Sequence, residues 1–465
     1  MEEYLSTLLS QIRCEKARNL VNAEIRGHIE DQAEENRKKG MSEAQALEAA
    51  VKDMGDPVEA GVMLDQIHRP QAAWGMILLM AVISLVSVLI HVVIGINADD
   101  TMVYSGRQYI LRSAGSVLIG FGAMLAVYRI DYSFMGKFAK IIAAVCVIFL
   151  ALLFFVPGLS LTLNGSIGYI PIGSGTISIK YGLLLLVPIY GALLYQYRGS
   201  GYKGLLKSLL WMFSIVFLTI CLPAISMAAE LLLMMGVLLT MAVWKGWFGT
   251  ARKRILAAFW SVAAGGPMLL AAQLFLSGRL AGYQTERFRY FLSGDTSKYD
   301  YTGTMLKSCL TQMKVLGAGE KSTAVTVPCF NSDYILTFLG TFYGLIAAIL
   351  VCLVLLFVTF RIFRISIRQK NQLGMIMGCG CGLVFLVSIL TNIAQNLSLL
   401  PRMGSFLPLF SFGGTGIVVC YVLIGIILSV YRYKNVLPVH LGESAAIGRG
   451  QQFGLKGGDQ SPTEM

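Results

Sequence analysis

Residues 334–360, YILTFLGTFYGLIAAILVCLVLLFVTF, decide the fold of this chain because they form 27 consecutive positions without a charged side chain. A helix needs only about 20 apolar residues to cross the roughly 30 Å hydrocarbon core of a membrane. The sequence therefore predicts an all-α polytopic membrane protein with about ten transmembrane helices. The expected spans are 74–96, 110–128, 138–157, 181–196, 205–222, 224–244, 255–276, 334–360, 373–391 and 409–431.

The composition supports this class. Of the 465 residues, 55% are apolar and 14% are charged, whereas about 25% are charged in an ordinary soluble domain. This excludes a single soluble globule. The charge is divided unevenly, since residues 1–72 hold 14 acids and 9 bases while the rest of the chain holds 12 acids and 29 bases. Few carboxylates are therefore available for acid–base chemistry in the membrane part.

Lysine and arginine residues gather in alternate short loops, namely those after the second, fourth, sixth, eighth and tenth spans. Short cytoplasmic loops of membrane proteins concentrate positive charge in this way. The pattern predicts a multi-pass membrane protein with both termini in the cytoplasm. It places the long segment 277–333 outside the cell. Because the bases are spread over alternate loops, a nucleic-acid surface is not expected.

Residues 1–70 are expected to form a small soluble helical bundle in the cytoplasm. Helical spacing of apolar residues, with breaks at Gly40 and Gly55-Asp56-Pro57, predicts three short amphipathic helices. The acidic surface of this bundle is either a solvated face or a docking site for a regulator. The membrane domain is expected over 71–435, and the polar, glycine-rich residues 436–465 are expected to be a flexible cytoplasmic tail.

Two carboxylates of the membrane domain are candidates for chemistry. Glu230 lies inside the sixth span, where a carboxylate is costly; it either lines a polar cavity or pairs with a donor on a neighbouring helix. Asp333 lies where the outer loop enters the eighth span. It is placed either to act as a general base for an external substrate or to cap the helix that follows.

The histidines and cysteines provide few further candidate functional residues on the outer side. None of the four histidines falls in the outer loops, which leaves Asp or Glu as the expected base there. Most of the nine cysteines lie in apolar spans. Cys309 and Cys329 are both in the long outer loop and are a candidate disulfide.

Several segments of the membrane part resemble the SEDS family of bacterial envelope proteins, the RodA, FtsW and SpoVE type. The most specific is LLPRMGSFLPLFSFGGTG, at 399–416, which is similar to a family motif ending in Ser-Tyr-Gly-Gly-Ser. The stretch from Ile25 to Leu64 instead resembles the prefix domain found ahead of some bacterial permeases. The other SEDS-like segments are SGRQYILRSAGSVLIGFGAMLAVYRIDY at 105–132, LTLNGSIGYIPIG at 161–173, GYQTER at 282–287 and VLGAGEKSTAVTVPCFNSDYILTFLGTFYG at 315–344.

The resemblance implies a peptidoglycan glycosyltransferase. SEDS proteins polymerise glycan strands from lipid II with a class B penicillin-binding protein, in division, elongation or sporulation. The essential carboxylate of the family's Asp-Phe-Ile-Phe signature falls on Asp333, which would remove the proton from the acceptor hydroxyl. The lipid diphosphate that leaves needs cationic or metal stabilisation. No cofactor is certain, and a divalent cation is one candidate.

The matched motifs also suggest substrate-binding residues. Outer-side cations on or beside them either contact the diphosphate or anchor the chain to membrane lipid headgroups. Ser411 and Thr415 could bind a sugar, and Gly413 with Gly414 could provide tight backbone there or serve helix packing. The remaining candidates are Tyr283, Gln284 and the cations Arg287, Lys321 and Arg402.

Other family positions have changed. The motif Pro-Asp-Leu-Gly-Thr is here Pro223-Ala224-Ile225-Ser226-Met227, so its aspartate is missing. TISIKYGLL replaces a Gln-Pro-Ser-Glu run, although Lys180 within it could supply positive charge. Two other functions therefore stay open: a transporter of a lipid-linked precursor, in which Glu230 would matter more than Asp333, and a catalytically inactive scaffold.

Overall fold

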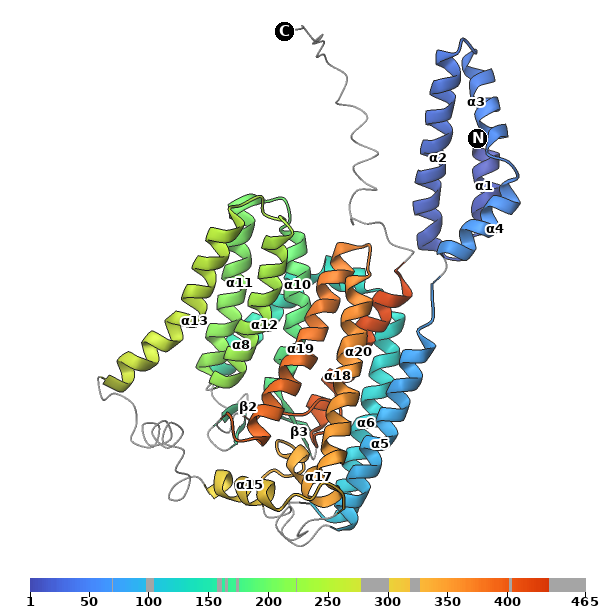
Figure 1. The fold of residues 1–465 in the computed structure, drawn as a ribbon. Coiled ribbons are helices and arrows are strands. Elements are labelled where there is room, and N and C mark those ends of the chain that lie inside the picture. Colours follow the sequence, from blue (N-terminus) through green and yellow to red (C-terminus); the bar gives the residue numbers. More distant parts are fainter. Residues whose placement is uncertain are drawn as a thin grey trace. The chain divides into compact units, whose positions relative to one another are not determined.

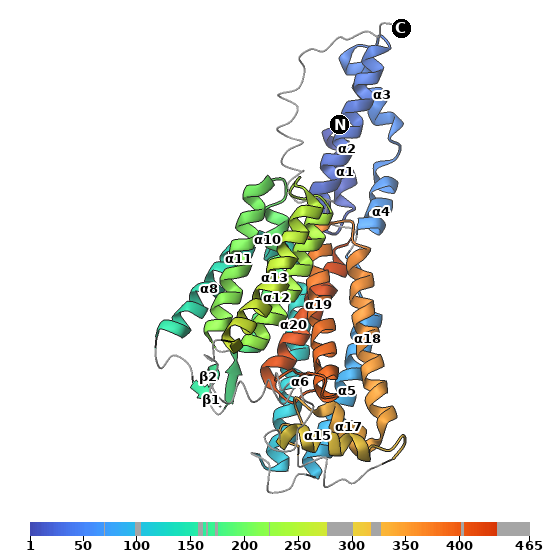
Figure 2. The same ribbon diagram turned by 60° about the vertical axis from the view of Figure 1, so that its left-hand side comes forward.

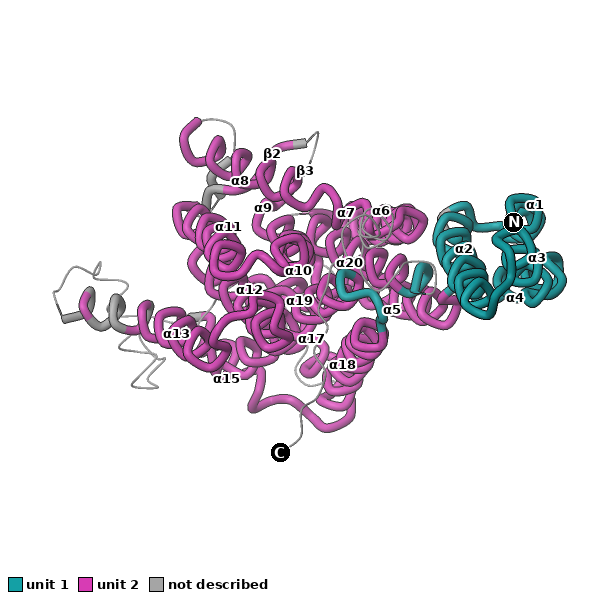
Figure 3. The backbone as a smooth tube through the Cα atoms, turned by 90° about the horizontal axis from the view of Figure 1, so that it is seen from above, with its two compact units in different colours: residues 1–72, 369–373, 431–465 teal, residues 73–368, 374–430 magenta. Residues whose placement is uncertain are grey.

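The chain divides into two compact units, which Figure 3 distinguishes by colour. Unit 1 consists of residues 1–72, 369–373 and 431–465, and unit 2 of residues 73–368 and 374–430. The structure is a computed structural model. It describes residues 1–68, 70–97, 104–156, 161–163, 166–172, 175–222, 224–276, 301–317, 327–400 and 404–434. The expected tail at 436–465 lies outside these ranges.

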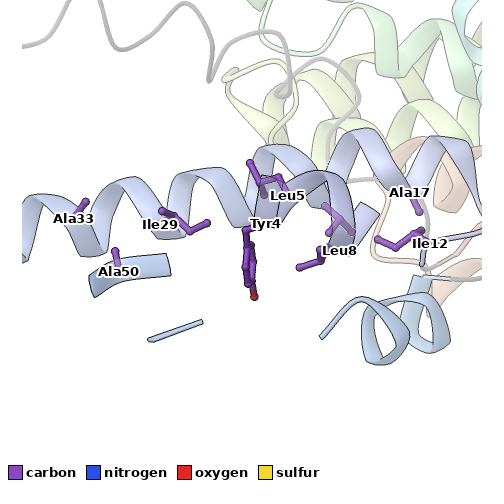
Figure 4. Close-up of a cluster of buried hydrophobic side chains, with 9 residues drawn as sticks. Tyr4, Leu5, Leu8, Ile12, Ala17, Ile29, Ala33 and Ala50 are labelled. Atoms are coloured by element: carbon purple, nitrogen blue, oxygen red, sulfur yellow. The ribbon is translucent and has the colours of Figure 1, made fainter. Parts of the chain in front are cut away.

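Unit 1 contains four helices before residue 70, so the prediction of three was wrong. They are α1 (Glu2–Ser10), α2 (Glu15–Lys38), α3 (Glu43–Asp53) and α4 (Pro57–His68). The missed helix is α1, which buries Leu5 and Leu8 in the apolar cluster of the unit (Figure 4). At the break before α4, the Asp56 carboxylate accepts a hydrogen bond of 3.0 Å from Val58 N, and proline suits the first helical position.

The fold class of unit 2 is confirmed: it is an all-α polytopic membrane fold, and each of the ten expected spans coincides with helix. Eight helices among the described residues are long and apolar enough to cross a membrane. The described helices of this unit are α5 (Trp74–Ile96), α6 (Gly106–Arg129), α7 (Tyr132–Lys137), α8 (Ala139–Phe155), α9 (Ile179–Gly182), η1 (Leu183–Leu185), α10 (Leu186–Gln196), α11 (Gly201–Cys221), α12 (Ile225–Trp244), α13 (Arg252–Leu276), α15 (Tyr301–Gln312), α17 (Ile335–Tyr343), α18 (Leu345–Ile367), α19 (Gln372–Asn396) and α20 (Gly414–Arg432).

The long apolar run at 334–360 is not one helix. Gly344 has φ of 104°, which ends α17 and separates it from α18. Only glycine adopts this backbone region at low cost, so an apolar pattern alone gives no sign of the break. The consequence is a short buried helix, α17, directly after Asp333, followed by α18 as the long membrane-spanning part.

A three-stranded antiparallel sheet lies between α8 and α9 and was not predicted. Its strands are β1 (Leu161–Leu163), β2 (Ser166–Ile172) and β3 (Gly175–Ser178), with Tyr169 of β2 opposite Ser178 of β3. A further helix, α15, interrupts the segment 277–333. Both views show this sheet, α15 and α17 at the same end of unit 2 (Figures 1 and 2). Asp333 precedes α17 and so belongs to this end.

Candidate active site

Two side chains at the end of α19 bind the backbone of Asp333. The side-chain amides of Asn392 and Asn396, four residues apart on one helix face, each donate a 3.0 Å hydrogen bond to the Asp333 carbonyl oxygen. Both asparagines are buried, and Asp333 itself is only 8% exposed. The backbone at this carboxylate is therefore fixed by side chains 59 and 63 positions away in sequence.

Asn396 of α19 caps the first turn of α17. Asn396 Oδ1 accepts hydrogen bonds from Thr337 N at 3.0 Å and from Thr337 Oγ1 at 2.8 Å. This satisfies a backbone donor in the first turn, as a capping side chain does. A side chain other than Asp333 thus serves this donor, so the start of α17 does not depend on the aspartate alone.

Lys180 brings positive charge to the Asp333 carboxylate. Its Nζ donates a 2.6 Å hydrogen bond to the carbonyl oxygen of Gly404. A Cβ atom added at Gly404 would lie 3.1 Å from Lys180 Nζ and 3.9 Å from Asp333 Oδ2. The ammonium and the carboxylate therefore approach Gly404 together, and they attract each other electrostatically.

Glu230 reaches the same cation from α12. Lys180 interacts electrostatically with Glu230 as well as with Asp333, and the Glu230 carboxylate also lies within hydrogen-bonding reach of the Thr391 hydroxyl on α19. The two candidate carboxylates, which the sequence suggested independently, thus both interact electrostatically with one lysine. The sequence suggested Lys180 only as a source of positive charge.

A small cavity adjoins Lys180. Its volume is about 20 Å³, room for about one water molecule, and Tyr169, Lys180, Thr219 and Ala224 are among the residues that line it. Burial raises the pKa of the Tyr169 phenol, and the negative charge of Asp333 raises it further. Tyr169 therefore stays neutral near the carboxylate, with a hydroxyl that can donate a hydrogen bond.

Three of the residues predicted at the sugar site, Ser411, Thr415 and Gly414, have structural roles. The Ser411 hydroxyl donates to Ser332 O at 2.6 Å and accepts from Leu407 N at 2.6 Å, so it fixes the residue before Asp333. Thr415 Oγ1 accepts from Ser178 N at 3.0 Å, which ties α20 to β3. A Cβ atom at Gly414 would lie 3.2 Å from the Ser116 hydroxyl of α6, which favours the packing explanation for this glycine.

Of the other candidate substrate-binding residues, Gly413 is among the described residues and five are not. A Cβ atom at Gly413 would meet nothing within 4 Å, so close backbone packing does not explain that glycine. Glycine is favoured instead at Gly404, where φ is +63°. Tyr283, Gln284, Arg287, Lys321 and Arg402 lie outside the described residues.

A buried histidine links α5 to the same loops. His91 Nε2 lies 2.8 Å from the carbonyl oxygen of Phe410, and Nδ1 lies 2.7 Å from the Tyr109 hydroxyl. A carbonyl can only accept, so in the neutral ring Nε2 carries the proton and Tyr109 donates to Nδ1. Tyr109 in turn accepts from the Asn331 side chain. This chain of bonds holds the Asn331 side chain, two residues before Asp333, and the Asn331 carbonyl accepts a 2.8 Å hydrogen bond from Phe412 N.

Backbone strain is concentrated near the same place. Cys329 and Leu409 are non-glycine residues with φ of 60° and 67°. Leu409 is buried, and its carbonyl accepts a 2.7 Å hydrogen bond from the Ser87 hydroxyl. Such strain persists where the surroundings enforce it and gathers at functional sites. Here it falls in the two loops that carry Asp333 and Ser411.

The candidate disulfide is not formed. Cys309 and Cys329 are both present as thiols; Cys309 is buried within α15 and Cys329 is exposed. The Cys309 thiol lies within hydrogen-bonding reach of the Thr341 hydroxyl of α17.

Among the described residues, no group of three or more His, Cys, Asp or Glu side chains is arranged to hold a metal ion. The carboxylates of Asp333 and Glu230 both interact electrostatically with the Lys180 ammonium. The candidate divalent cation would thus compete with a lysine for these two ligands.

A family model described as "Cell cycle protein", which covers FtsW, RodA and SpoVE, matches residues 71–436. The chain belongs to the FtsW/RodA/SpoVE family. It is 25% identical over 345 residues to the probable peptidoglycan glycosyltransferase FtsW of Thioalkalivibrio sulfidiphilus, which covers 72% of this chain and 82% of the relative. It is 22% identical over 346 residues to stage V sporulation protein E of Bacillus subtilis, with 72% and 89% covered.

Solved structures agree with the fold of this FtsW/RodA/SpoVE member. A chain from a peptidoglycan synthase complex that coordinates polymerisation and crosslinking superposes with a TM-score of 0.61 at 16% identity, over 78% of this chain and 98% of that one. RodA, the rod shape determining protein of Thermus thermophilus, gives a TM-score of 0.54 at 14% identity, over 78% and 97%.

The residues that support Asp333 in this family member were not predicted. Asn392 and Asn396 lie just beyond the expected end of the ninth span at residue 391, but α19 continues to Asn396. Polar side chains four residues apart at the end of an apolar helix were the available signal. Their partners, the carbonyl of Asp333 and the amide of Thr337, are backbone groups, which no residue type reveals.

Proposed function

We propose that this chain is a peptidoglycan glycosyltransferase that polymerises lipid II at the outer face of the bacterial cell membrane, with both termini in the cytoplasm. Membership of the FtsW/RodA/SpoVE family and relatives with that activity in their names support the proposal. The observation that carries it is local. A buried aspartate and a lysine ammonium approach the same glycine, Gly404, at one end of the helical unit.

Asp333 acts as the general base. In glycosyl transfer, the acceptor hydroxyl of one sugar attacks the anomeric carbon of the donor, and its proton passes to the base. A base is effective only when its position is fixed within hydrogen-bonding reach of that proton. The bonds from Asn392 and Asn396 to the Asp333 carbonyl, together with Ser411 on the preceding carbonyl, support this positional requirement.

Lys180 compensates the charge of the leaving group. Negative charge develops on the lipid diphosphate as the glycosidic bond breaks, and a preorganised cation at that point lowers the barrier. The ammonium has three N–H donors, one of which binds Gly404 O. The predicted cations Arg287, Lys321 and Arg402 are proposed to contact the rest of the diphosphate, and Tyr283 and Gln284 to contact the substrate beside them.

A class B penicillin-binding protein is the proposed partner. One structural neighbour comes from a peptidoglycan synthase complex that coordinates polymerisation and crosslinking. The two activities belong together because a polymerised strand is the substrate for crosslinking. We therefore expect the partner to raise the polymerisation rate of this chain when both are purified into the same detergent micelle or nanodisc.

The test is polymerisation of lipid II by purified protein, with and without the partner, read as glycan strands on a gel. Asp333→Asn keeps the size of the side chain and removes the base, so the rate should fall about 10²–10⁴-fold. Asp131→Asn is the matched control, because Asp131 is an equally buried aspartate that caps α7 through Ser133 N; it should retain activity. Full activity of Asp333→Asn refutes the assignment.

The same preparation separates the two other functions. Passage of labelled lipid II across vesicles without strand formation, blocked by Glu230→Gln but not by Asp333→Asn, would identify a transporter. An inactive scaffold would neither polymerise nor transport lipid II, and Asp333 substitutions would leave cell shape and division unchanged.

A further inference from the structure

An apolar pocket that the proposed reaction does not use is lined by residues of α15, α17, α18 and α19. It belongs to the end of unit 2 where α15 and α17 lie together (Figures 1 and 2). Its volume is about 290 Å³. A dry apolar cavity of about 150 Å³ binds one benzene molecule, so this pocket has room for roughly twelve carbon atoms. A buried water needs two to four polar partners, so hydrocarbon fits these apolar walls better than water does.

The pocket opens along α18, a helix long and apolar enough to cross a membrane. Leu345, Ile349 and Leu353 line the pocket and are 42%, 47% and 57% exposed. Residues four apart form one row along a helix. Ala348 and Cys352, also four apart, complete this wall. Within a membrane the exposed row faces lipid, so a lipid chain can enter the pocket directly from the bilayer.

The part of the wall on α17 and α19 is apolar although it includes Thr337 and Asn396. The Thr337 hydroxyl donates a 2.8 Å hydrogen bond to Asn396 Oδ1. Asn396 Nδ2 donates a 3.0 Å hydrogen bond to the Asp333 carbonyl oxygen. These polar atoms are satisfied within the protein, so the pocket offers no polar group that would select a polar ligand.

Positive charge lies beside the pocket. Lys314 is exposed and directly follows Met313, which lines the pocket. The Lys314 carbonyl oxygen accepts a 2.9 Å hydrogen bond from the amide of Leu345, another lining residue. The segment 301–317 contains Lys307 as a second lysine and has no aspartate or glutamate. Because lysine attracts the phosphate of an anionic lipid, the pocket and its rim together match a hydrocarbon chain with an acidic headgroup.

The loop that carries Lys314 also has the character of a membrane interface. Its next two residues, Val315 and Leu316, are exposed apolar side chains. A Cβ atom at Gly344 would lie 3.0 Å from Val315 O and 3.1 Å from the Leu316 Cα atom, so the loop is packed against the residue before α18. Exposed apolar side chains next to a basic one are typical of a segment between headgroups and acyl chains. This places the Lys314 ammonium at the level of lipid phosphates.

We propose that this pocket binds one acyl chain of an anionic phospholipid from the surrounding bilayer, with the lipid phosphate on Lys314. Room for roughly twelve carbon atoms accommodates most of a single acyl chain. The bound lipid fills the space between α17 and α18 and packs against Thr337 and Asn396. The inference goes beyond the proposed function, because it concerns a lipid of the membrane and not the substrate of the reaction.

The first experiment uses the purified full chain in detergent and phosphatidylglycerol with a photoreactive diazirine in one acyl chain. Labelled residues are identified by mass spectrometry after irradiation and digestion. Leu336 lines the pocket and is 6% exposed, so label on Leu336 reports a chain inside the pocket and not lipid on the outer surface of α18. We expect this label in the unsubstituted protein, and its absence overturns the proposal.

Filling the pocket should remove the label. Ala348→Phe places a ring in the lining and should lower the Leu336 label at least about fivefold; Cys352→Phe, four residues further along the same row, should act in the same way. Leu350→Phe is the matched control, because Leu350 is an exposed residue of the same helix outside the pocket lining; it should keep the label. Unchanged label in folded Ala348→Phe and Cys352→Phe overturns the proposal.

The headgroup is tested with phosphatidylcholine that carries the same photoreactive chain and no net charge. It should label Leu336 about fivefold less than phosphatidylglycerol does, the factor expected for one lysine near a lipid phosphate. Lys314→Gln should lower the phosphatidylglycerol label to that level. Lys203→Gln, at an exposed lysine of α11, should not. Equal labelling by the two lipids, or an unaffected label in Lys314→Gln, overturns the role of the phosphate.

A prenyl diphosphate tests the competing occupant, the chain of a lipid-linked substrate. An equimolar amount should leave the phosphatidylglycerol label on Leu336 unchanged; displacement would assign the pocket to a substrate chain and overturn the proposal. Phosphatidylglycerol should also raise the unfolding midpoint of delipidated protein, since a ligand stabilises the state that binds it, and should raise that of Ala348→Phe less. None of these readouts requires polymerisation, so failure of the proposed function would leave them able to decide the lipid site.

Discussion

Gly404 provides a direct test of the geometry at the site. Its φ of +63° lies in the left-handed region, and a Cβ atom there would sit 3.1 Å from Lys180 Nζ and 3.9 Å from Asp333 Oδ2. Gly404→Ala therefore does two separable things. It places a side chain on a backbone that disfavours one, at a cost of about 1–2 kcal/mol, and it presses a methyl group against the ammonium.

The displaced ammonium should change the catalytic rate more than the stability. The methyl contact at 3.1 Å is tighter than ordinary van der Waals contact, so the ammonium must move by a few tenths of an ångström. Lysine is flexible, and this movement costs little stability. Catalysis is more sensitive, because a misplacement of about 1 Å can cost about 10²-fold. We expect Gly404→Ala to lose about 1–2 kcal/mol of unfolding free energy and roughly tenfold in polymerisation rate.

Gly199→Ala is the matched control. Gly199 also has positive φ, 77°, but a Cβ atom there meets nothing within 4 Å. This variant should lose similar stability, measured by thermal unfolding in detergent, and should keep its polymerisation rate per folded molecule. If Gly404→Ala polymerises lipid II at the wild-type rate, or if both variants lose rate equally, the argument for a required contact at Gly404 is refuted.

Three other predictions concern the surroundings of the base. Asn396→Ala removes the acceptor of the buried Thr337 amide, at a cost of about 1–3 kcal/mol, and one of the hydrogen bonds to the Asp333 carbonyl. The unfolding midpoint and the polymerisation rate should both fall. Asn396→Asp should restore the bond to the Thr337 amide but not the bond to the Asp333 carbonyl. His91→Ala should lower the unfolding midpoint because it leaves a buried carbonyl unsatisfied, and His91→Gln, which retains a donor, should lower it less; equal losses would contradict the proposed bond. Cys329 should react with a maleimide equally with and without reductant, whereas a labelling gain on reduction would indicate a disulfide.

The membrane helices could be predicted from the sequence because hydrophobic length is a property of each segment by itself. The run at 334–360 shows the limit of this reasoning. Its composition is uniform across Gly344, and the break there depends on a backbone angle that a hydropathy pattern does not encode. The sheet at 161–178 was missed for a related reason, since its short strands are stabilised by pairing with one another.

The candidate base could be predicted and its supports could not. Asp333 stood out because carboxylates are rare in the membrane part and because a family motif falls on it. The side chains that hold this aspartate and the first turn of the next helix come from another helix and bond to the backbone. Asn396 is the clearest case, since it binds both the Asp333 carbonyl and the Thr337 amide. The residue types along one segment do not reveal such a contact.

The charge at the site constrains what else must bind the donor. An ionised Asp333, the form that acts as a base, cancels the single positive charge of the Lys180 ammonium. A lipid diphosphate adds negative charge, so this lysine by itself attracts it only weakly. The proposed reaction therefore requires at least one further cation. Arg402 is the predicted cation nearest in sequence to the lysine's anchor, since it lies two residues before Gly404, whose carbonyl Lys180 binds.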